Sequence, residues 1–230
     1  IQELIEQFVG AGHKIRYIDW RQQPFNYSKI NNVAARECQT PILLFLNDDV
    51  SVISSDWLTS MVELIDRPEV GAVGAKLLFP NGSIQHAGVI MGLFENCGHA
   101  FYGLDGALPH YFGFADVIRN VSAVTGACLM TKTDVFWKVG GFDEERLAVA
   151  FNDVDLCLKI GASGYRVLFT PFAQLYHHES FSKTQKDLIP HPTEVAIMQS
   201  KWKEVIADDP YYSPNLTRRK ADYSLPTLWT

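Results

Sequence analysis

The sequence predicts an α/β fold, in which a largely parallel sheet is flanked by helices. Segments with the helical spacing of apolar residues alternate along the chain with short apolar segments, as they do in βαβ units. The expected strand at 41–46 is short and uniformly apolar, which is typical of a parallel strand covered on both faces. A chain of 230 residues with 47% hydrophobic content is also large enough to bury a full sheet in one domain.

The first third of the chain alternates between helix and strand. Residues 1–9 place apolar side chains at the i, i+3, i+4 spacing of an amphipathic helix, which Gly10 and Gly12 stop. A turn at Arg67 and Pro68 separates a later helix from its strand. In chain order the expected elements are helix 1–9, strand 14–20, helix 27–35, strand 41–46, helix 57–65 and strand 70–78.

The rest of the chain begins with an irregular region. Residues 81–119 are rich in Gly and aromatic residues without a clear period, and we expect irregular or short antiparallel structure there that could line a pocket. The expected elements that follow are strand 121–132, helix 133–141, helix 153–164, strand 165–171 and helix 192–206. We expect residues 1–190 to form the core, and 191–230 to add a helix and a surface-wrapping tail to the same domain.

Composition excludes several classes of function. A net charge of −6 argues against a nucleic-acid backbone as the main partner, because that binding depends on clustered cations. The four cysteines form no CxxC pair, which argues against a zinc site or a disulfide scaffold and favours a reducing cytoplasm. No apolar run approaches the ~20 residues of a membrane span.

Three polar residues, Asn47, Asp48 and Asp49, directly follow the apolar strand at 41–46. Ligands of open α/β sheets bind beyond the carboxyl ends of the strands, where these side chains fall. A turn of the backbone there would bring both carboxylates toward one hard cation. The alternative is a polar turn that caps the next element, and the pair alone supports either interpretation equally.

Three further motifs favour a site. The stretches "GGFDE" (140–144), "NDVDLCLK" (152–159) and "LYHHES" (175–180) each place acids or imidazoles beside an expected strand or helix end. Polar turns alone would not explain two more acid pairs and a His pair at the ends of expected elements.

With "NYSKINNVAA" (26–35), "PEVGAVGAKLLFPNGSIQHAG" (68–88) and "VTGACLMTK" (124–132), these motifs make the sequence resemble the family 2 glycosyltransferases of bacterial surface-polysaccharide synthesis, especially their rhamnosyltransferase-like branch. The resemblance spans nearly all of the chain. It implies a GT-A fold, which is Rossmann-like, with a mixed and mostly parallel sheet. It also implies a nucleotide-diphosphate sugar donor (a dTDP- or UDP-sugar), a divalent metal (Mn²⁺ or Mg²⁺) and an inverting mechanism.

The resemblance assigns roles to the strand-end residues. Asn47, Asp48 and Asp49 occupy the place of the family's Asp-x-Asp motif, so that Asp49 would bind the metal and Asp48 would help to hold the ribose or the metal. Asn47 departs from the usual first aspartate and offers a neutral oxygen instead of a charge. His177 matches the family's metal-binding histidine, whereas for His178 a structural and a functional role are equally supported.

A second set of roles concerns the acceptor side. Asn152 and Asp153 match a Glu-Asp segment of the family, which would make Asp153 the catalytic base. The metal would neutralise the diphosphate leaving group, and the base would take the proton of the attacking hydroxyl. The alternative for Asp153 and Asp155 is that they cap the helix that begins there, and this alternative is favoured for Asp155.

Three weaker candidates concern nucleotide and sugar binding. Ser28 and Asn32 would reach the nucleotide, with helix capping as an equally supported alternative. Gly126 would let the donor sugar approach the backbone, although a glycine in a strand can also mark a bulge.

The family normally opens with a Pro-rich first strand and with a second strand that carries an acid for the nucleotide base, and neither is found before Ile1. The resemblance therefore implies a domain that is incomplete at its N-terminus and poorly active alone. The acceptor would be a glycan or lipid-linked glycan, at the inner face of the membrane, with peripheral association of a full-length protein. The alternative function is a non-catalytic sugar-binding or assembly module of a larger polysaccharide-synthesis protein.

Overall fold

The core of the structure, a computed structural model, is a mixed sheet. The structure describes residues 2–10, 12, 14–178 and 192–226. Within these residues the strand order is β1-β8-β3-β9-β2, with β4 paired to β3 and β7 paired to β9. The strands of this sheet are β1 (Ile42–Leu46), β2 (Val50–Val52), β3 (Val70–Leu78), β4 (Ile84–His86), β7 (Arg119–Asn120), β8 (Cys128–Lys132) and β9 (Arg166–His177).

The central pair of the sheet, β3 and β9, runs parallel, whereas the other described pairs run antiparallel. All nine residues of β3 are buried, as expected of a strand covered on both faces. β8 is antiparallel to β3 because the chain reaches it through the loops and short strands of 79–127 and not through a crossover helix.

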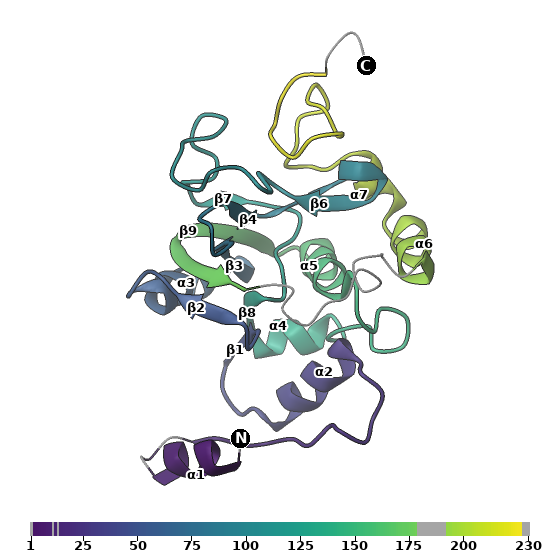
Figure 1. Cartoon of the computed structure of the whole chain (residues 1–230). Helices are drawn as coiled ribbons and strands as arrows, with labels where there is room; N and C mark the ends of the chain where they lie inside the picture. The colour runs from purple at the N-terminus through teal and green to yellow at the C-terminus, as the bar shows by residue number, and fades with distance from the viewer. Residues whose placement is uncertain (1, 11, 13, 179–191, 227–230) are drawn as a thin grey trace.

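Helices cover both faces of the sheet (Figure 1). α3 (Trp57–Ile65) packs its apolar side against β3 and β9 in one core cluster. α2 (Tyr27–Glu37), α4 (Thr133–Lys138) and α5 (Asn152–Ala162) contribute to the cluster on the other face. The expected α/β fold, a mixed sheet flanked by helices, is therefore confirmed.

The expectation of a parallel strand covered on both faces at 41–46 is wrong. β1 stands at the end of the described strand order and pairs antiparallel with β8. Only Leu43 and Phe45 of β1 are buried, because no second described strand covers its other edge.

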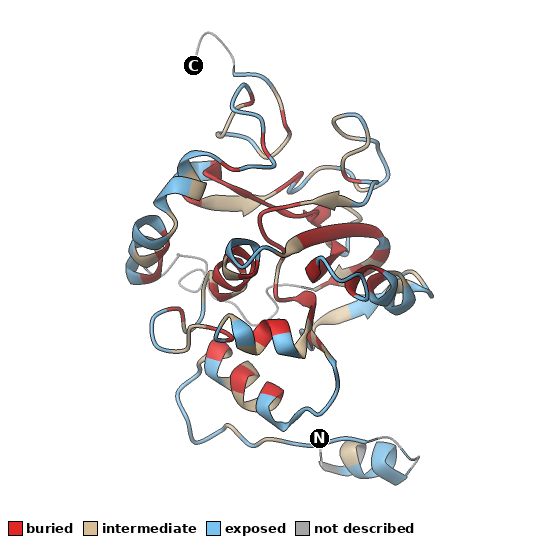
Figure 2. Ribbon diagram, turned by 180° about the vertical axis from the view of Figure 1, so that it is seen from behind, coloured by how far each residue is buried: buried red, intermediate tan, exposed pale blue. Residues whose placement is uncertain are grey.

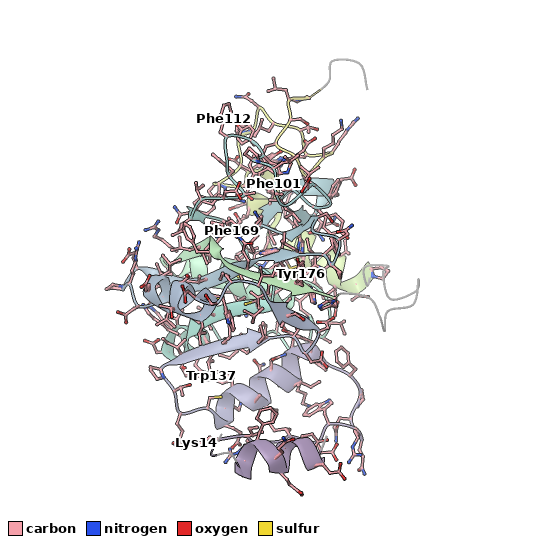
Figure 3. The ribbon with its side chains drawn as sticks, turned by 60° about the vertical axis from the view of Figure 1, so that its left-hand side comes forward. Lys14, Phe101, Phe112, Trp137, Phe169 and Tyr176 are labelled. Carbon is pink, nitrogen blue, oxygen red and sulfur yellow. The ribbon has the colours of Figure 1, made fainter. Side chains whose placement is uncertain are left out.

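The N-terminal region lies apart from this core. α1 (Gln2–Gly10) and the segment after it lie at the end of the molecule marked by Lys14 in Figure 3, and they are mostly pale blue, the colour of exposed residues, in Figure 2. The expected strand at 14–20 is wrong: these residues form no strand, and Ile15 and Tyr17 are exposed. The physical reason is that they pair with no described strand, so no ladder of hydrogen bonds holds them extended.

Two strand boundaries differ from the expectation. The expected strand 165–171 ends at Pro171, and proline cannot donate to the hydrogen-bond ladder of a sheet. β9 continues to His177, because its register against β3 jumps from Thr170 to Gln174 and the intervening residues leave the ladder. β8 is shorter than the expected strand 121–132, since it begins only at Cys128, after the turn that contains Gly126.

The middle region forms irregular structure with short antiparallel strands, as expected. β5 (Val89–Met91) pairs antiparallel with β6 (Cys97–His99), and a 3₁₀ turn, η1 (Leu93–Glu95), joins them. Lys76 is buried in β3 and its ammonium group lies 2.8 Å from the Asp116 carboxylate, which ties the outer loop to the sheet. That loop extends to exposed Phe112, at the end of the molecule opposite Lys14 (Figure 3).

The C-terminal residues pack onto this middle region. The expected helix 192–206 is present as two helices, α6 (Pro192–Lys201) and α7 (Lys203–Ala207). After them Tyr212, Leu216 and Tyr223 are buried in the larger core cluster. No helix of the described part of the chain is long and apolar enough to cross a membrane.

Candidate active site

The pairing of β2 with β9 builds the first part of the site. Val50 of β2 lies opposite His177 of β9, and the His178 N–H donates to the Asp49 carbonyl over 2.8 Å. Asp49 precedes β2 directly, so this register places it beside His177. The Asp49 Oδ1 and His177 Nε2 atoms lie 2.9 Å apart. Figure 3 labels Tyr176, which marks this end of β9.

The His177 ring is held on both of its nitrogen atoms. Its Nδ1 lies 2.6 Å from the side-chain oxygen of Gln85, and its Nε2 lies 3.3 Å from the side-chain nitrogen of Asn47. His177 and Gln85 are both buried. The ring therefore has one orientation, which directs Nε2 toward the strand end that carries Asp49.

The residues at this strand end fit a divalent cation. Asp49 Oδ1 is buried and accepts no hydrogen bond, although Nε2 of His177 is close, so the two atoms approach without hydrogen-bond alignment. Adjacent ligands of an octahedral ion at about 2.1 Å lie about 3 Å apart, which matches the distance between Oδ1 and Nε2. The carboxylate oxygen suits both Mn²⁺ and Mg²⁺, and the imidazole nitrogen favours Mn²⁺ of the two.

The protein alone does not complete a coordination shell. Among the residues that the structure describes, no group of three or more His, Cys, Asp or Glu side chains is arranged to hold a metal. A cation at Asp49 and His177 would therefore need further ligands, and the oxygens of a diphosphate are of the right chemical type.

Asp153 forms the second part of the site. It lies in the first turn of α5, where its two carboxylate oxygens accept hydrogen bonds from the N–H groups of Gly126 and Val154, both over 2.8 Å. A Cβ atom at position 126 would lie 2.9 Å from the Tyr27 hydroxyl and 3.4 Å from the Asp153 Cβ, so only glycine allows this close approach. The carboxylate is thus fixed by the backbone on both oxygens.

Tyr27 supports the same turn from α2. Its hydroxyl donates to the Gly126 carbonyl over 3.1 Å. Burial, followed by the nearby Asp153 carboxylate, raises the pKa of Tyr27, which keeps the hydroxyl protonated as a donor.

Both parts of the site line one cleft with a volume of about 540 Å³. The predicted site residues in its wall are Asn47, Asp48, Asp49, Gly126, Asn152, Asp153 and His177. The structure therefore brings together residues from the ends of β1 and β9, the turn before β8 and the start of α5. The aromatic side chains of Phe25, Tyr27 and Phe151 and the imidazole of His99 add to the same wall.

Ser28 and Asn32 do not line this cleft. Both are buried in α2, where Ser28 donates its hydroxyl to the Leu147 carbonyl and Asn32 donates to the Phe142 carbonyl over 2.9 Å. They hold α2 against the loop before α5. The cap of α2 is Asn26, whose side chain accepts from the Lys29 N–H, so the capping alternative does not describe them either.

The two neighbours whose roles were open have structural contacts. Asp155 is fully buried and meets Lys201, Lys159 and the indole N–H of Trp202, so it ties α6 to α5. His178 lies next to His177 on the chain, but its Nε2 is 3.0 Å from the Ser51 hydroxyl.

Sequence reasoning missed the role of Gln85. It belongs to the stretch "PNGSIQHAG", which contributed to the family resemblance without a role for any single residue. The available signal was a pair of polar residues, Gln85 and His86, which lie on a short strand shortly before Gly88. Burial, followed by the charge of His99, lowers the pKa of His86, and its Nε2 accepts from the N–H of Gly88 over 3.2 Å.

This fold is that of the GT-A glycosyltransferases. The structure matches the solved structure of GalNAc-T7 with UDP, GalNAc and Mn²⁺ with a TM-score of 0.64 over 95% of this chain and 44% of that chain, at 12% identity. At that identity the match shows the fold. The sequence identifies the family: the model of the glycosyltransferase-like family matches residues 4–196, so the chain belongs to that family.

Curated relatives agree with this family. The chain is 44% identical over 227 residues to the uncharacterized protein y4gI of Sinorhizobium fredii, covering 97% of this chain and 25% of that protein. It is 41% identical over 225 residues to the O-antigen biosynthesis protein RfbC of Myxococcus xanthus, covering 96% and 17%. A shorter match, 37% over 73 residues, covers 32% of this chain and 23% of the N-acetylglucosaminyl-diphospho-decaprenol L-rhamnosyltransferase of Mycobacterium tuberculosis. The chain thus spans about a quarter or less of the length of these relatives.

Proposed function

We propose that this domain is a metal-dependent, inverting glycosyltransferase, which moves a sugar from a nucleotide-diphosphate donor to a hydroxyl group of a growing cell-surface glycan. One observation carries the proposal: a buried carboxylate oxygen without a hydrogen bond, Oδ1 of Asp49, lies 2.9 Å from the Nε2 of His177 in the cleft that also holds Asp153. The relative with the printed name of an O-antigen biosynthesis protein supports the choice of glycan.

Asp49 and His177 would hold a divalent cation, Mn²⁺ or Mg²⁺, and Asp48 would contribute to the metal or to the donor ribose. When bound, the cation would supply positive charge to the diphosphate as it leaves. The residues of the chain provide the orientation: Gln85 holds the His177 ring through Nδ1, which leaves Nε2 for the cation, and the β2–β9 register holds Asp49 beside it.

Asp153 would take the proton from the acceptor hydroxyl as that oxygen attacks the sugar carbon. Each of its oxygens accepts one backbone hydrogen bond and keeps a second lone pair for the proton. Because backbone N–H groups of Gly126 and Val154 hold the carboxylate, it would need no reorganisation when the acceptor arrives. Gly126 would also leave room for the sugar at the same turn.

The finer identity of the substrates is part of this proposal. We expect a dTDP- or UDP-sugar as donor and a glycan or lipid-linked glycan as acceptor. The shorter match to a rhamnosyltransferase named for a decaprenol-linked substrate supports a lipid-linked acceptor. Such an acceptor would be met in the cytoplasm at the inner face of the membrane.

The test is an Asp153→Asn variant of the protein assayed with a panel of UDP- and dTDP-sugars and Mn²⁺, with release of nucleoside diphosphate as readout. We expect kcat to fall by about 10²-fold or more with little change in donor affinity, because the amide keeps the shape but cannot take a proton. Removal of the metal with a chelator should abolish release in the unmodified protein.

Asp134→Asn is the matched control. Asp134 lies in the first turn of α4, and its carboxylate accepts from the next N–H over 2.7 Å, as Asp153 does from Val154, but it does not line the cleft. Its substitution should leave turnover unchanged. Normal turnover of Asp153→Asn would exclude Asp153 as the base. Donor binding that the chelator does not weaken, without any turnover in the unmodified protein, would favour a non-catalytic sugar-binding module.

A further inference from the structure

Gln85 makes a contact that neither the sequence motifs nor the proposed reaction assigns. It lies on β4, and its side chain is only 2% exposed. Its side-chain oxygen lies 2.6 Å from Nδ1 of His177, which is a short contact for a nitrogen and an oxygen atom. The buried, neutral side chain of Gln85 on β4 thus contacts Nδ1 of His177, the ring nitrogen other than the one beside Asp49.

We propose that Gln85 is a positioning residue that fixes the tautomer of His177, so that the proton is on Nδ1 and Nε2 carries an unprotonated lone pair beside Asp49, which a cation would take in place of the Asn47 N–H. The inference rests on the proposed function, because an unprotonated Nε2 matters only if that nitrogen binds a cation. It concerns the chain itself, however, since a tautomer can be measured without any metal.

The contact between Gln85 and His177 determines where the ring proton lies. An amide oxygen accepts hydrogen bonds and cannot donate them, so a contact with Nδ1 requires the proton to be on Nδ1. A neutral imidazole with a proton on Nδ1 has an unprotonated Nε2. The hydrogen bond made by one ring nitrogen therefore decides what the other nitrogen can do.

Asn47, which directly follows β1, contacts the other ring nitrogen of His177. Its side-chain nitrogen, which can only donate, lies 3.3 Å from Nε2 of His177. Nε2 must therefore accept, which assigns the same tautomer as the contact at Nδ1. Two amides from different parts of the fold agree on the proton position.

Asp49 lies on the Nε2 side of the His177 ring. When Nε2 is unprotonated, this nitrogen presents a lone pair, and it lies 2.9 Å from Oδ1 of Asp49, which accepts no hydrogen bond. Two electron-rich atoms at this distance repel each other unless a cation lies between or beside them. The tautomer set by Gln85 thus makes the Asp49–His177 pair a ligand pair in place of a hydrogen-bonded pair.

The surroundings of Gln85 hold it in place. Its main-chain oxygen lies 3.0 Å from Nδ1 of His99, and the next residue, His86, accepts from the Gly88 N–H with its Nε2. A glutamine also sets the tautomer without adding a negative charge beside Asp49, which a carboxylate would do. A metal-binding histidine usually donates its other ring N–H to an oxygen acceptor, and here the Gln85 amide oxygen would be that acceptor.

The decisive measurement is the pair of ring ¹⁵N chemical shifts of His177 in metal-free, ¹⁵N-labelled protein, at one pH about two units above the ordinary imidazole value. The signals are assigned by their loss in His177→Gln. We expect the protonated-nitrogen shift at Nδ1 and the unprotonated shift at Nε2. The opposite pattern in the unmodified protein would overturn the proposal without the need for any further variant.

Variants then test whether Gln85 causes the pattern. Gln85→Met keeps the approximate length of the side chain but removes the acceptor, and it should shift the proton away from Nδ1. Gln85→Glu restores an acceptor and should restore the Nδ1 proton. Gln174→Met, on β9 three residues before His177, is the matched control and should change neither shift. An unchanged tautomer in folded Gln85→Met would overturn the proposal.

A second readout separates this proposal from the proposed function. Binding of Mn²⁺ in the presence of UDP, followed by the electron paramagnetic resonance of free Mn²⁺, should weaken about 10- to 100-fold in Gln85→Met and much less in Gln85→Glu. Absence of Mn²⁺ binding in the unmodified protein would contradict the metal role of His177. In that case the ¹⁵N shifts would still decide whether Gln85 sets the tautomer. Unchanged Mn²⁺ affinity in Gln85→Met together with a changed tautomer would remove the functional part of the inference.

Discussion

Substitution of Asp155 by asparagine should destabilise the protein without removing a reacting group. Asp155 is fully buried in α5, two residues after the proposed base. One of its oxygens lies 2.6 Å from the Lys201 ammonium group and accepts from the Trp202 indole over 2.8 Å. The other lies 3.2 Å from the Lys159 ammonium group, without hydrogen-bond alignment. Both lysines therefore share this one carboxylate, and Lys159 also donates to the Gly141 carbonyl over 2.6 Å.

The size of the effect follows from these contacts. Removal of one partner of a buried ion pair costs about 3–5 kcal/mol. The amide of the variant can still accept from Trp202, and the Lys159 and Lys201 side chains keep 19% and 27% exposure, so water can solvate their charges. We therefore expect a loss at the lower end, about 3 kcal/mol in the free energy of unfolding. For a domain of this size that is about 6–12 °C in Tm.

The assay is urea unfolding followed by tryptophan fluorescence and circular dichroism, with coincidence of the two transitions as the check for two-state behaviour. Asp153→Asn is the matched variant, because its carboxylate is on the same helix turn but lines the cleft. It should lose about 1 kcal/mol or less in stability while losing turnover. A loss of less than about 0.5 kcal/mol in Asp155→Asn would refute the reasoning, since changes of that size are typical of surface positions.

Two further substitutions test the site. His177→Ala should abolish Mn²⁺-dependent donor binding. His178→Ala should retain this binding, because the native His178 ring contacts the Ser51 hydroxyl through Nε2. Titration of both variants with Mn²⁺ and UDP measures the effect, and equal losses of binding would contradict the assignment of His177 to the metal. Gly126→Ala should lower turnover and cost about 1–3 kcal/mol in stability, because the new Cβ would lie 2.9 Å from the Tyr27 hydroxyl. In the double variant Gly126→Ala/Tyr27→Phe, the loss of the hydroxyl should relieve part of the destabilisation caused by Gly126→Ala. If urea unfolding shows that the double variant loses as much free energy of unfolding as the two single variants added together, the clash with the Tyr27 hydroxyl is contradicted.

The sequence by itself determined the elements whose signals are local. α3 and β3 begin and end at the expected residues, because a helical period and an apolar strand need only neighbouring residues to be recognised. The motifs also pointed to Asp49, Asp153 and His177, which line one cleft. The family membership follows from the same local motifs, spread over residues 4–196.

The tertiary structure decided which segments find partners. Residues 14–20 have the pattern of a strand, but a strand exists only where another backbone pairs with it, and no described strand does. β9 passes Pro171 because a bulge against β3 takes the proline out of the ladder. Neither outcome is contained in the local pattern, because both depend on a neighbour far away in the chain.

The same division holds inside the site. Asp153 and Asp155 look alike in sequence, and only the packing of α6 against α5 buries one of them while the other faces the cleft. The contact between Asp49 and His177 depends on the register of β2 against β9, and the contact of Gln85 with His177 depends on where β4 lies. Sequence determined which chemical groups are present; the pairing of distant strands decided which of them touch, because a hydrogen bond or a metal ligand pair requires atoms within about 3 Å of each other.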